Sequence, residues 1–170
     1  MANFILIQLI GAIGYGTIAF SYYKQDKKDI LFIQIISYIF FTVHYYLLGG
    51  LTGAICNILG LIGFMLIYLF DKYKVKSKKI LTVCLIPLLI IISLATYENV
   101  FSIFPIFASV ISIIAFLTNN ENEIRRIGIV SAICWFIYAV IYKSYIAIAF
   151  EILLIISTII AFIKNSKNRN

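Results

Sequence analysis

The sequence predicts an all-helical membrane protein with seven transmembrane helices. Hydrophobic residues make up 63% of the 170 residues, mean hydropathy is +1.05, and charged residues account for only 12%. A soluble domain carries about 45–50% apolar and about 25% charged residues. Because this composition cannot cover a water-exposed surface, it excludes soluble, disulfide-rich secreted and disordered classes of protein.

Charged segments divide the chain into apolar stretches of about 20 residues, the length of a transmembrane helix. Residues 30–70 include no Asp, Glu, Lys or Arg and accommodate two helices around a Gly49-Gly50 turn. The first stretch has no basic segment before it and no small-residue cleavage site, so we expect a retained helix. The expected spans are about 3–23, 30–48, 51–70, 80–97, 100–118, 127–142 and 145–163.

Basic residues predict how these spans are oriented. If the N-terminus is outside, all of the 14 Lys and Arg residues except Lys143 belong to cytoplasmic segments. Short cytoplasmic loops of membrane proteins are enriched in Lys and Arg. We therefore expect the N-terminus outside and the C-terminus in the cytoplasm, and we interpret the +7 net charge as a topology signal rather than as a nucleic-acid surface.

The second half of the chain repeats the pattern of the first. Residues 18–20 and 114–116 both read Ile-Ala-Phe before a polar loop. After a two-residue change in loop length, the aligned pairs are Ser37 with Ser131, Phe41 with Trp135, His44 with Tyr138, and Asn57 with Glu151. This pattern predicts two parallel three-helix units, at 1–70 and 99–164, joined by a linker at 71–98 that contains helix four, with a polar tail at 165–170.

The chain resembles the YgjV-type family of bacterial inner-membrane proteins in the segments QLIGAIGYGTIAFSYYKQDKKD, VHYYLLGGLTGAICNILG, FPIFASVISIIAF, ICWFIYAVIYKS and FEILLIIS. Its 3+1+3 order of spans also resembles the SWEET, or PQ-loop (MtN3-like), transporters. These resemblances imply a SWEET-like bundle of parallel repeats in the bacterial cytoplasmic membrane.

The resemblance to SWEET-like carriers also implies particular site residues. In those carriers an Asn in the third span of each repeat holds the substrate, and a Pro in the first span serves as a hinge. Asn57 and Pro105 match these places, whereas Glu151 and Leu9 depart from the pattern and no PQ dipeptide occurs. The departures argue against a sugar as substrate.

Glu151 is the only acidic residue inside an expected span. An ionised carboxyl costs several kcal/mol in hydrocarbon, so intramembrane acids usually face a cavity and take part in function. Burial favours the neutral carboxyl, which can bind a proton or ionise against a cationic solute. The alternative is a neutral Glu that hydrogen-bonds neighbouring helices.

Other polar residues lie in the same half of the bundle when depth is counted at 1.5 Å per residue. His44, the only histidine, suits either a proton relay with Glu151 or an interfacial place among aromatic residues. We expect one polar pocket between the repeats, with substrate-binding residues Gln8, His44, Asn57, Trp135, Tyr138 and Glu151 and with Pro105 as hinge.

Two functions fit this pattern. The first is a membrane transporter or facilitator of a small polar solute, proton-coupled through Glu151, with its site between the two repeats. The alternative is a non-transporting module that docks a protein or lipid, in which polar residues hold the helices together. The expected partners are the bilayer and the unidentified solute, and a second copy of the chain is compatible with the sequence.

We expect no enzymatic activity and no catalytic residue. The sequence contains no nucleophile triad, carboxylate pair, metal-ligand set or phosphate-binding loop, so no cofactor and no metal site are expected. Cys56, Cys84 and Cys134 each lie in an apolar stretch without CxxC spacing, which indicates buried thiols.

Overall fold

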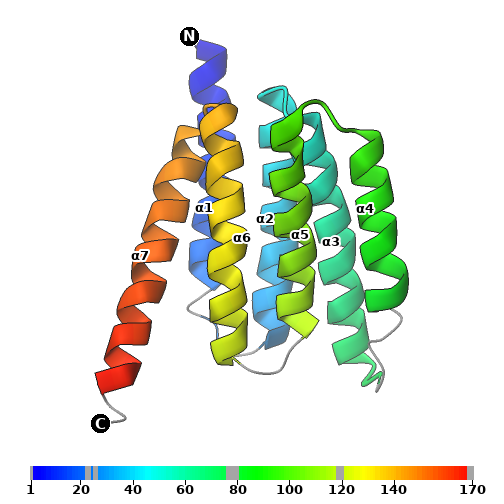
Figure 1. Ribbon diagram of the computed structural model, residues 1–170, viewed down its shortest axis with the longest axis vertical. Coiled ribbons are helices and arrows are strands. Elements are labelled where there is room, and N and C mark those ends of the chain that lie inside the picture. The colour runs from blue at the N-terminus through cyan, green and yellow to red at the C-terminus, as the bar shows by residue number, and fades with distance from the viewer. Residues whose placement is uncertain (1, 22–23, 25–26, 76–80, 118–120, 168–170) are drawn as a thin grey trace.

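The computed structural model describes residues 2–21, 24, 27–75, 81–117 and 121–167, and their helices run alternately up and down the molecule (Figure 1). The α-helices are α1 (Ala2–Ser21), α2 (Lys27–Leu47), α3 (Leu51–Lys72), α4 (Ile86–Ala95), α5 (Ile103–Leu117), α6 (Glu121–Ile141) and α7 (Tyr145–Lys167). The prediction of seven helices is confirmed, and the described residues form no strand.

Two short helical turns extend the fourth and fifth spans. A π-helical turn, η1 (Leu81–Leu85), precedes α4, and a 3-10 turn, η2 (Val100–Ser102), precedes α5. Pro87 is the second residue of α4 and has no N–H group, so it cannot donate the α-helical hydrogen bond to Val83. This missing donor explains why the helix changes its hydrogen-bonding pattern there.

The lengths of the helices suit a bilayer. Three of them are long and apolar enough to cross a membrane by length and composition, at Asn3–Ser21, Asp29–Leu47 and Leu51–Lys72. The other apolar helical segments with described side chains are shorter, at Val83–Ala95, Val100–Ala115, Ile127–Ile141 and Tyr145–Ile159. As whole helices, α6 and α7 have 21 and 23 residues, which corresponds to about 30–35 Å at 1.5 Å per residue.

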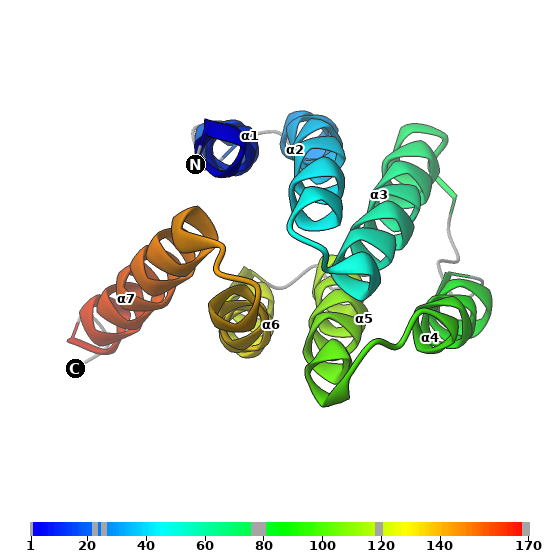
Figure 2. The same ribbon diagram turned by 90° about the horizontal axis from the view of Figure 1, so that it is seen from above.

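Six helices form a closed ring, seen from above in Figure 2. Around the ring, α1 packs against α2, α2 against α3, α3 against α5, α5 against α6, α6 against α7, and α7 against α1. The helix α4 lies outside this ring against α3 and α5. We call α1–α3 the first half and α5–α7 the second half, and their contacts α3–α5 and α7–α1 the two seams.

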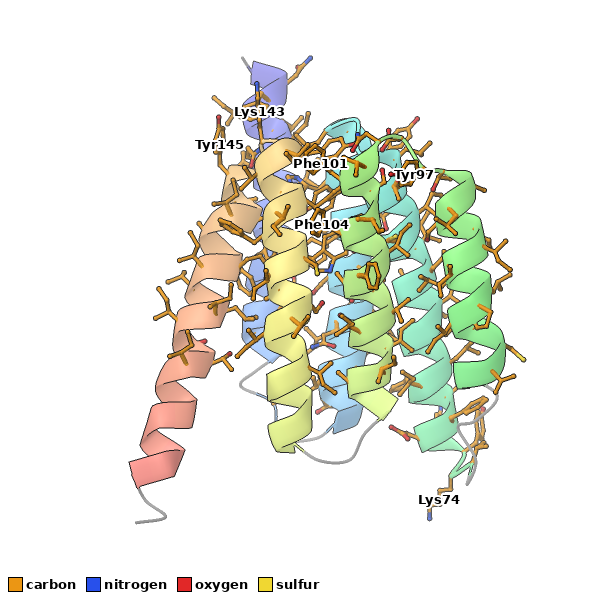
Figure 3. The ribbon with its side chains drawn as sticks, in the orientation of Figure 1. Lys74, Tyr97, Phe101, Phe104, Lys143 and Tyr145 are labelled. Carbon is orange, nitrogen blue, oxygen red and sulfur yellow. The ribbon has the colours of Figure 1, made fainter. Side chains whose placement is uncertain are left out.

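The outer surface of the bundle is apolar, as expected for contact with lipid. Ile5, Ile91 and Leu153 expose 60%, 66% and 65% of their surface. Exposed aromatic residues gather near one end, where Figure 3 shows Tyr97, Phe101 and Tyr145. Aromatic side chains of membrane proteins concentrate at the level of the lipid headgroups.

The two ends of the bundle differ in charge. The end with the aromatic residues contains the turns Leu48–Gly50, Thr96–Asn99 and Tyr142–Ser144, and we call it the turn end. Lys143 lies at the turn end, whereas Lys74 lies at the opposite end (Figure 3), together with Lys72 and Lys24. This distribution agrees with the predicted segregation of charge, and the assignment of the turn end to the outside stays a prediction.

Two turns at this end have the same geometry at positions 94 residues apart. Gly49 and Lys143 both adopt positive φ, +83° and +54°. The backbone donor–acceptor pairs are Leu48–His44, Gly49–Tyr46 and Gly50–Tyr45 in the first turn and Tyr142–Tyr138, Lys143–Val140 and Ser144–Ala139 in the second. The following helices also begin alike, because Ala54 donates to Gly50 at 3.0 Å and Ile148 donates to Ser144 at 3.0 Å.

Candidate functional site

Glu151 faces the interior of the bundle rather than the lipid. It is the seventh residue of α7 and exposes 7% of its surface. Its carboxyl interacts with the hydroxyl group of Tyr15 on α1, across one of the two seams. The Tyr15 ring is held between Phe41 and Phe150, with centroid distances of 4.5 Å to each. The Glu151 carboxyl therefore lies beside a tyrosine whose ring is held in place by two phenylalanine rings.

Tyr45 supplies a second hydroxyl group near Glu151. Its side chain is 1% exposed, and its hydroxyl is a buried polar atom without a hydrogen-bond partner among the described residues. The hydroxyl groups of Tyr15 and Ser144 are its polar neighbours, and Glu151 lies close enough for electrostatic interaction. A buried hydroxyl without a partner costs about 1–3 kcal/mol, so this group is available to a bound molecule. We call Tyr15, Tyr45 and Glu151 the Glu151 cluster.

Aromatic rings connect this cluster with the second half. The Tyr45 ring lies 5.4 Å from the ring of Trp135 and 5.4 Å from that of Tyr138, both on α6. Tyr138 in turn lies 4.5 Å from Tyr142. These contacts join α2 to α6 across the middle of the ring of helices.

His44 is fully buried and uses both ring nitrogens in contacts to other elements. Its Nδ1 lies 2.8 Å from the Ile7 carbonyl, and its Nε2 lies 2.6 Å from the Ser144 hydroxyl. Because a carbonyl can only accept, the neutral ring carries its proton on Nδ1, and Nε2 accepts from Ser144. Gly11 permits this approach, since a Cβ there would lie 2.8 Å from Nδ1. The structure thus pairs His44 with Ile7 and Ser144, not with Glu151.

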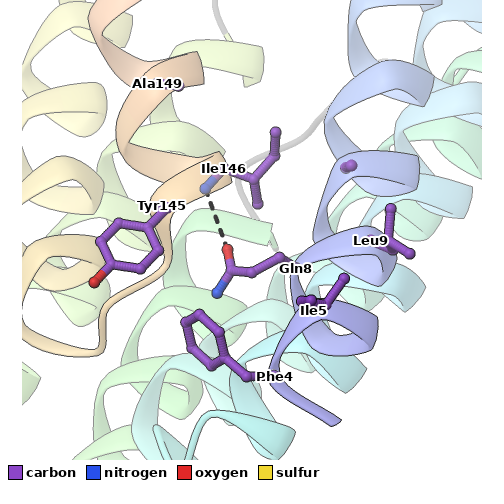
Figure 4. Close-up of a pocket in the computed structure, with 8 residues that line it drawn as sticks. Phe4, Ile5, Gln8, Leu9, Tyr145, Ile146 and Ala149 are labelled. Carbon is purple, nitrogen blue, oxygen red and sulfur yellow. Dashed lines mark hydrogen bonds between the residues drawn. The ribbon is translucent and has the colours of Figure 1, made fainter. Parts of the chain in front are cut away.

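Gln8 binds the beginning of α7. Its amide donates to the Lys143 carbonyl at 3.1 Å. The same amide accepts from the Ile146 N–H at 3.2 Å, the bond drawn in Figure 4. It lines a groove of about 400 Å³ between α1 and α7, whose other lining side chains include Phe4, Leu9 and Tyr145. Gln8 therefore satisfies backbone groups that a helix end leaves without partners.

Tyr138 binds the beginning of α3 in a similar way. It is fully buried, and its hydroxyl accepts from the Gly53 N–H at 3.0 Å. A Cβ at Gly53 would lie 2.4 Å from the Tyr138 ring, so only glycine allows this contact.

Asn57 lies at the same depth as Glu151, as the seventh residue of its helix. It is 2% exposed, and its amide donates to the Gly53 carbonyl of its own helix at 3.0 Å. Helices α3 and α7 are opposite members of the ring (Figure 2), so Asn57 and Glu151 have separate immediate partners. Their joint role in substrate binding stays a prediction.

Pro105 is buried and is the third residue of α5. A proline in the first turn of a helix breaks no helical hydrogen bond, because that N–H has no intrahelical acceptor. The helix continues without interruption to Leu117. A hinge at Pro105 stays a prediction.

A further polar network lies at the turn end, which the sequence did not predict. Glu98 accepts from the Thr52 N–H at 3.2 Å and from the Tyr142 hydroxyl at 3.0 Å. The Thr52 hydroxyl donates to the Thr96 carbonyl, and the Asn99 amide donates to Tyr142. Negative charge at the beginning of α3 is also favoured by the helix dipole.

The sequence reasoning also missed Tyr15 and Tyr45 as neighbours of Glu151. Tyr15 lies four residues after Gly11, on the helix face that packs closely inward, and this spacing was the available signal. Tyr45 directly follows His44, and nothing in its local sequence distinguishes it from an aromatic residue at the membrane interface. Its place inside the ring depends on how α2 packs against α6.

Comparison with known proteins gives one match. No curated protein and no solved structure is similar enough to match the chain. The model of the Imp-YgjV family, described as bacterial inner membrane protein, matches residues 5–169, which is nearly the whole chain. The buried carboxyl, the apolar outer surface and the ring of helices therefore belong to a membrane protein of the bacterial inner membrane, and the chain is a member of the Imp-YgjV family.

Proposed function

We propose that this protein transports or facilitates the passage of a small polar solute across the inner membrane, with the Glu151 cluster as its binding site. One observation carries the proposal: a carboxyl buried inside the ring of helices faces a tyrosine hydroxyl, beside a second buried hydroxyl that makes no hydrogen bond to the described part of the chain. Buried polar groups that serve only stability are normally paired. Intramembrane acids that face the bundle interior are typical of solute or proton pathways.

The internal repeat supports a transport mechanism. The ring order is consistent with a half-turn that exchanges α1 with α5, α2 with α6, and α3 with α7. The matching turns around Gly49 and Lys143 support the same correspondence. We infer a 3+1+3 arrangement of parallel repeats, in which the two halves rock against each other at their seams. The Glu151 cluster lies at one of these seams, where such a motion changes its exposure.

The chemistry of the cluster favours a solute that donates hydrogen bonds or carries positive charge. A carboxylate binds such groups, and a neutral carboxyl can carry a proton in their place. The α1 helix, which contributes Tyr15, has no basic residue between Ala2 and Ser21. No basic residue of α1 can therefore pair with the Glu151 carboxylate, and the charge of the site changes when Glu151 binds or releases a proton.

Proton movement gives a test that needs no knowledge of the solute. The protein is reconstituted in liposomes containing a pH-sensitive dye, a pH step is applied, and Glu151→Gln is compared with wild type. We expect wild type to exchange protons faster than empty liposomes and Glu151→Gln to lose this excess. Asp29→Asn is the matched control, because Asp29 is an exposed carboxyl near the beginning of α2. Equal rates for wild type, Glu151→Gln and empty liposomes contradict proton coupling.

A ligand screen tests solute binding independently. Thermal unfolding is measured with representative amino acids, diamines and sugars as probes, since a ligand that binds only the folded state raises its stability. We expect a cationic or hydrogen-bond-donating probe to stabilise wild type and to have no effect on Glu151→Gln.

The non-transporting module remains the second candidate, and a specific observation favours it. Gln8, His44 and Tyr138 are all engaged in contacts between helices, as expected of residues that only hold a bundle together. If no probe stabilises the protein and Glu151→Gln behaves as wild type in both assays, this second candidate is the better description.

A further inference from the structure

We propose that two contacts between the halves, Tyr138 with Gly53 and His44 with Ser144, form a gate that closes the turn end. The structure is then the state that is closed at this end. This inference rests on the proposed function, because a gate regulates access to the Glu151 cluster.

The two contacts occupy corresponding positions in the two halves. In each contact, the second helix of one half reaches the beginning of the third helix of the other half. Tyr138 on α6 binds the beginning of α3, and His44 on α2 binds the beginning of α7. The residues correspond at a separation of 94 positions, which pairs His44 with Tyr138 and Gly50 with Ser144. A half-turn therefore exchanges Tyr138 with His44, Gly50 with Ser144 and Gly53 with Ala147, so corresponding helices meet at both places although the two hydrogen bonds use different residues of the third helix.

The sizes of the partners are matched at each seam. Tyr138 is large, and it faces glycines at positions 50 and 53, where an added Cβ would lie 2.7 Å and 2.4 Å from it. The imidazole of His44 is smaller, and the corresponding residues on the other side are Ser144 and Ala147, both fully buried. The larger Tyr138 thus faces glycines and the smaller His44 faces serine and alanine. This matching of sizes allows both contacts to be closed at the same time.

A second hydrogen bond accompanies each contact, and its donors, Ile146 and Thr52, correspond at 94 positions. The Ile146 N–H at the beginning of α7 donates to Gln8 on α1. The Thr52 N–H at the beginning of α3 donates to Glu98, in the segment before α5. The first N–H groups of a helix have no intrahelical acceptor, so Gln8 of the first half supplies one for α7 and Glu98 of the linker supplies one for α3. Opening the turn end requires breaking the hydrogen bonds between the halves, which are Tyr138–Gly53, His44–Ser144 and Gln8–Ile146.

The distance between α2 and α6 at the turn end reports whether this gate is open. Leu47 and Ile141 are the last residues of these opposite helices, correspond at 94 positions and expose 46% and 40% of their surface. Spin labels are attached at Leu47→Cys and Ile141→Cys in a chain whose three native cysteines are replaced by alanine. Pulsed electron resonance in lipid nanodiscs then measures the distribution of distances.

Two tyrosines on α6 provide a matched pair of variants. Tyr138→Phe removes a hydroxyl that bonds across a seam, whereas Tyr142→Phe removes one that bonds Glu98 and Asn99 on its own side. Loss of one hydrogen bond shifts an equilibrium about 3- to 10-fold. We expect Tyr138→Phe to increase the fraction of longer distances by this factor and Tyr142→Phe to leave the distribution as in wild type.

Ser144→Ala tests the other seam and keeps the proposal falsifiable if Tyr138→Phe does not fold. We expect it to populate the same longer distance as Tyr138→Phe, because both seams open in one motion. An unchanged distribution in both variants, or an equal shift in Tyr142→Phe, overturns the gate. The measurement uses no solute, so the gate and the proposed function can fail separately. If the distances change as expected but Glu151→Gln retains full proton exchange, the proposed function is refuted and the gate is not.

Discussion

Gly53→Ala tests the close contact between the two halves most directly. The new Cβ would lie 2.4 Å from Tyr138 Cε1 and 2.9 Å from its hydroxyl oxygen. Carbon atoms prefer separations of about 3.5–4.0 Å, so the ring must move by more than 1 Å by that estimate. Tyr45, Trp135 and Tyr142 pack around the same ring at 5.4, 6.1 and 4.5 Å between centroids, which resists this movement.

The expected change in the free energy of unfolding combines two destabilising contributions with one stabilising contribution. Overpacking a well-filled interior costs about 1–3 kcal/mol, and stretching the Gly53–Tyr138 hydrogen bond adds about 0.5–1.5 kcal/mol. Replacing glycine by alanine within a helix returns about 0.5–1 kcal/mol. We expect Gly53→Ala to lower the free energy of unfolding by about 1–3 kcal/mol, combining these ranges.

The assay is unfolding by SDS in mixed micelles, followed by fluorescence. Trp135 is the only tryptophan and lies 6.1 Å from the Tyr138 ring, so its emission reports on this region. Gly16→Ala is the matched control, because apart from its chain neighbours and the backbone of its own helix no described atom lies within 4 Å of a Cβ at Gly16, and we expect it to be neutral or stabilising. Combining Gly53→Ala with Tyr138→His reproduces the pairing of histidine and alanine found at the other seam, and we expect partial recovery.

A neutral Gly53→Ala variant would refute the reasoning, since it would mean that the Tyr138 ring moves at no cost. The same conclusion follows if Tyr138→His fails to reduce the effect of Gly53→Ala. In that case the correspondence between the two seams does not extend to their packing.

Four further predictions follow from single features. Glu151→Leu should lower stability in SDS unfolding relative to Glu151→Gln, because only Gln keeps a hydrogen-bonding group for Tyr15. Lys143→Gly should raise the free energy of unfolding by up to about 1 kcal/mol, because Lys143 adopts φ +54°, a backbone conformation that glycine adopts without strain. A loss of stability would contradict the interpretation that the Lys143 backbone is strained. Gln8→Leu should lower stability by about 1 kcal/mol, as for a lost helix cap, and slower hydrogen exchange at Ile146 would contradict this role. With native cysteines removed, a membrane-impermeant thiol reagent should label Lys143→Cys and not Lys74→Cys in whole cells, and the reverse pattern would invert the topology.

The number of helices was predictable because it depends on local chemistry, whereas their limits were predictable only in part: α6 begins at Glu121 rather than near residue 127, and α7 continues to Lys167. Runs without charge must be long enough to span the bilayer, and Gly49, Glu98 and Lys143 mark the short connections between them. The fourth span differs most, since Pro87 changes its hydrogen bonding in a way that hydropathy does not reveal.

The candidate site was predictable only in part. Burial of Glu151 and Asn57 follows from their polarity, and their equal depth follows from the alignment of the halves. Their partners do not follow, because a partner depends on how neighbouring helices cross and on ring size. His44 shows this clearly: its ring reaches Ile7 and Ser144 only because Gly11 leaves space for it.

The position of α4 outside the ring has a consequence for assembly. It touches α3 and α5 but does not separate any neighbours around the ring, so the ring can be described as two three-helix subunits joined by a tether. A single intervening helix returns the chain to the side where the second subunit must begin, which gives both subunits the same direction. In the proposed 3+1+3 arrangement the molecule corresponds to a covalently linked dimer, and α4 is the segment that joins its two halves into one polypeptide.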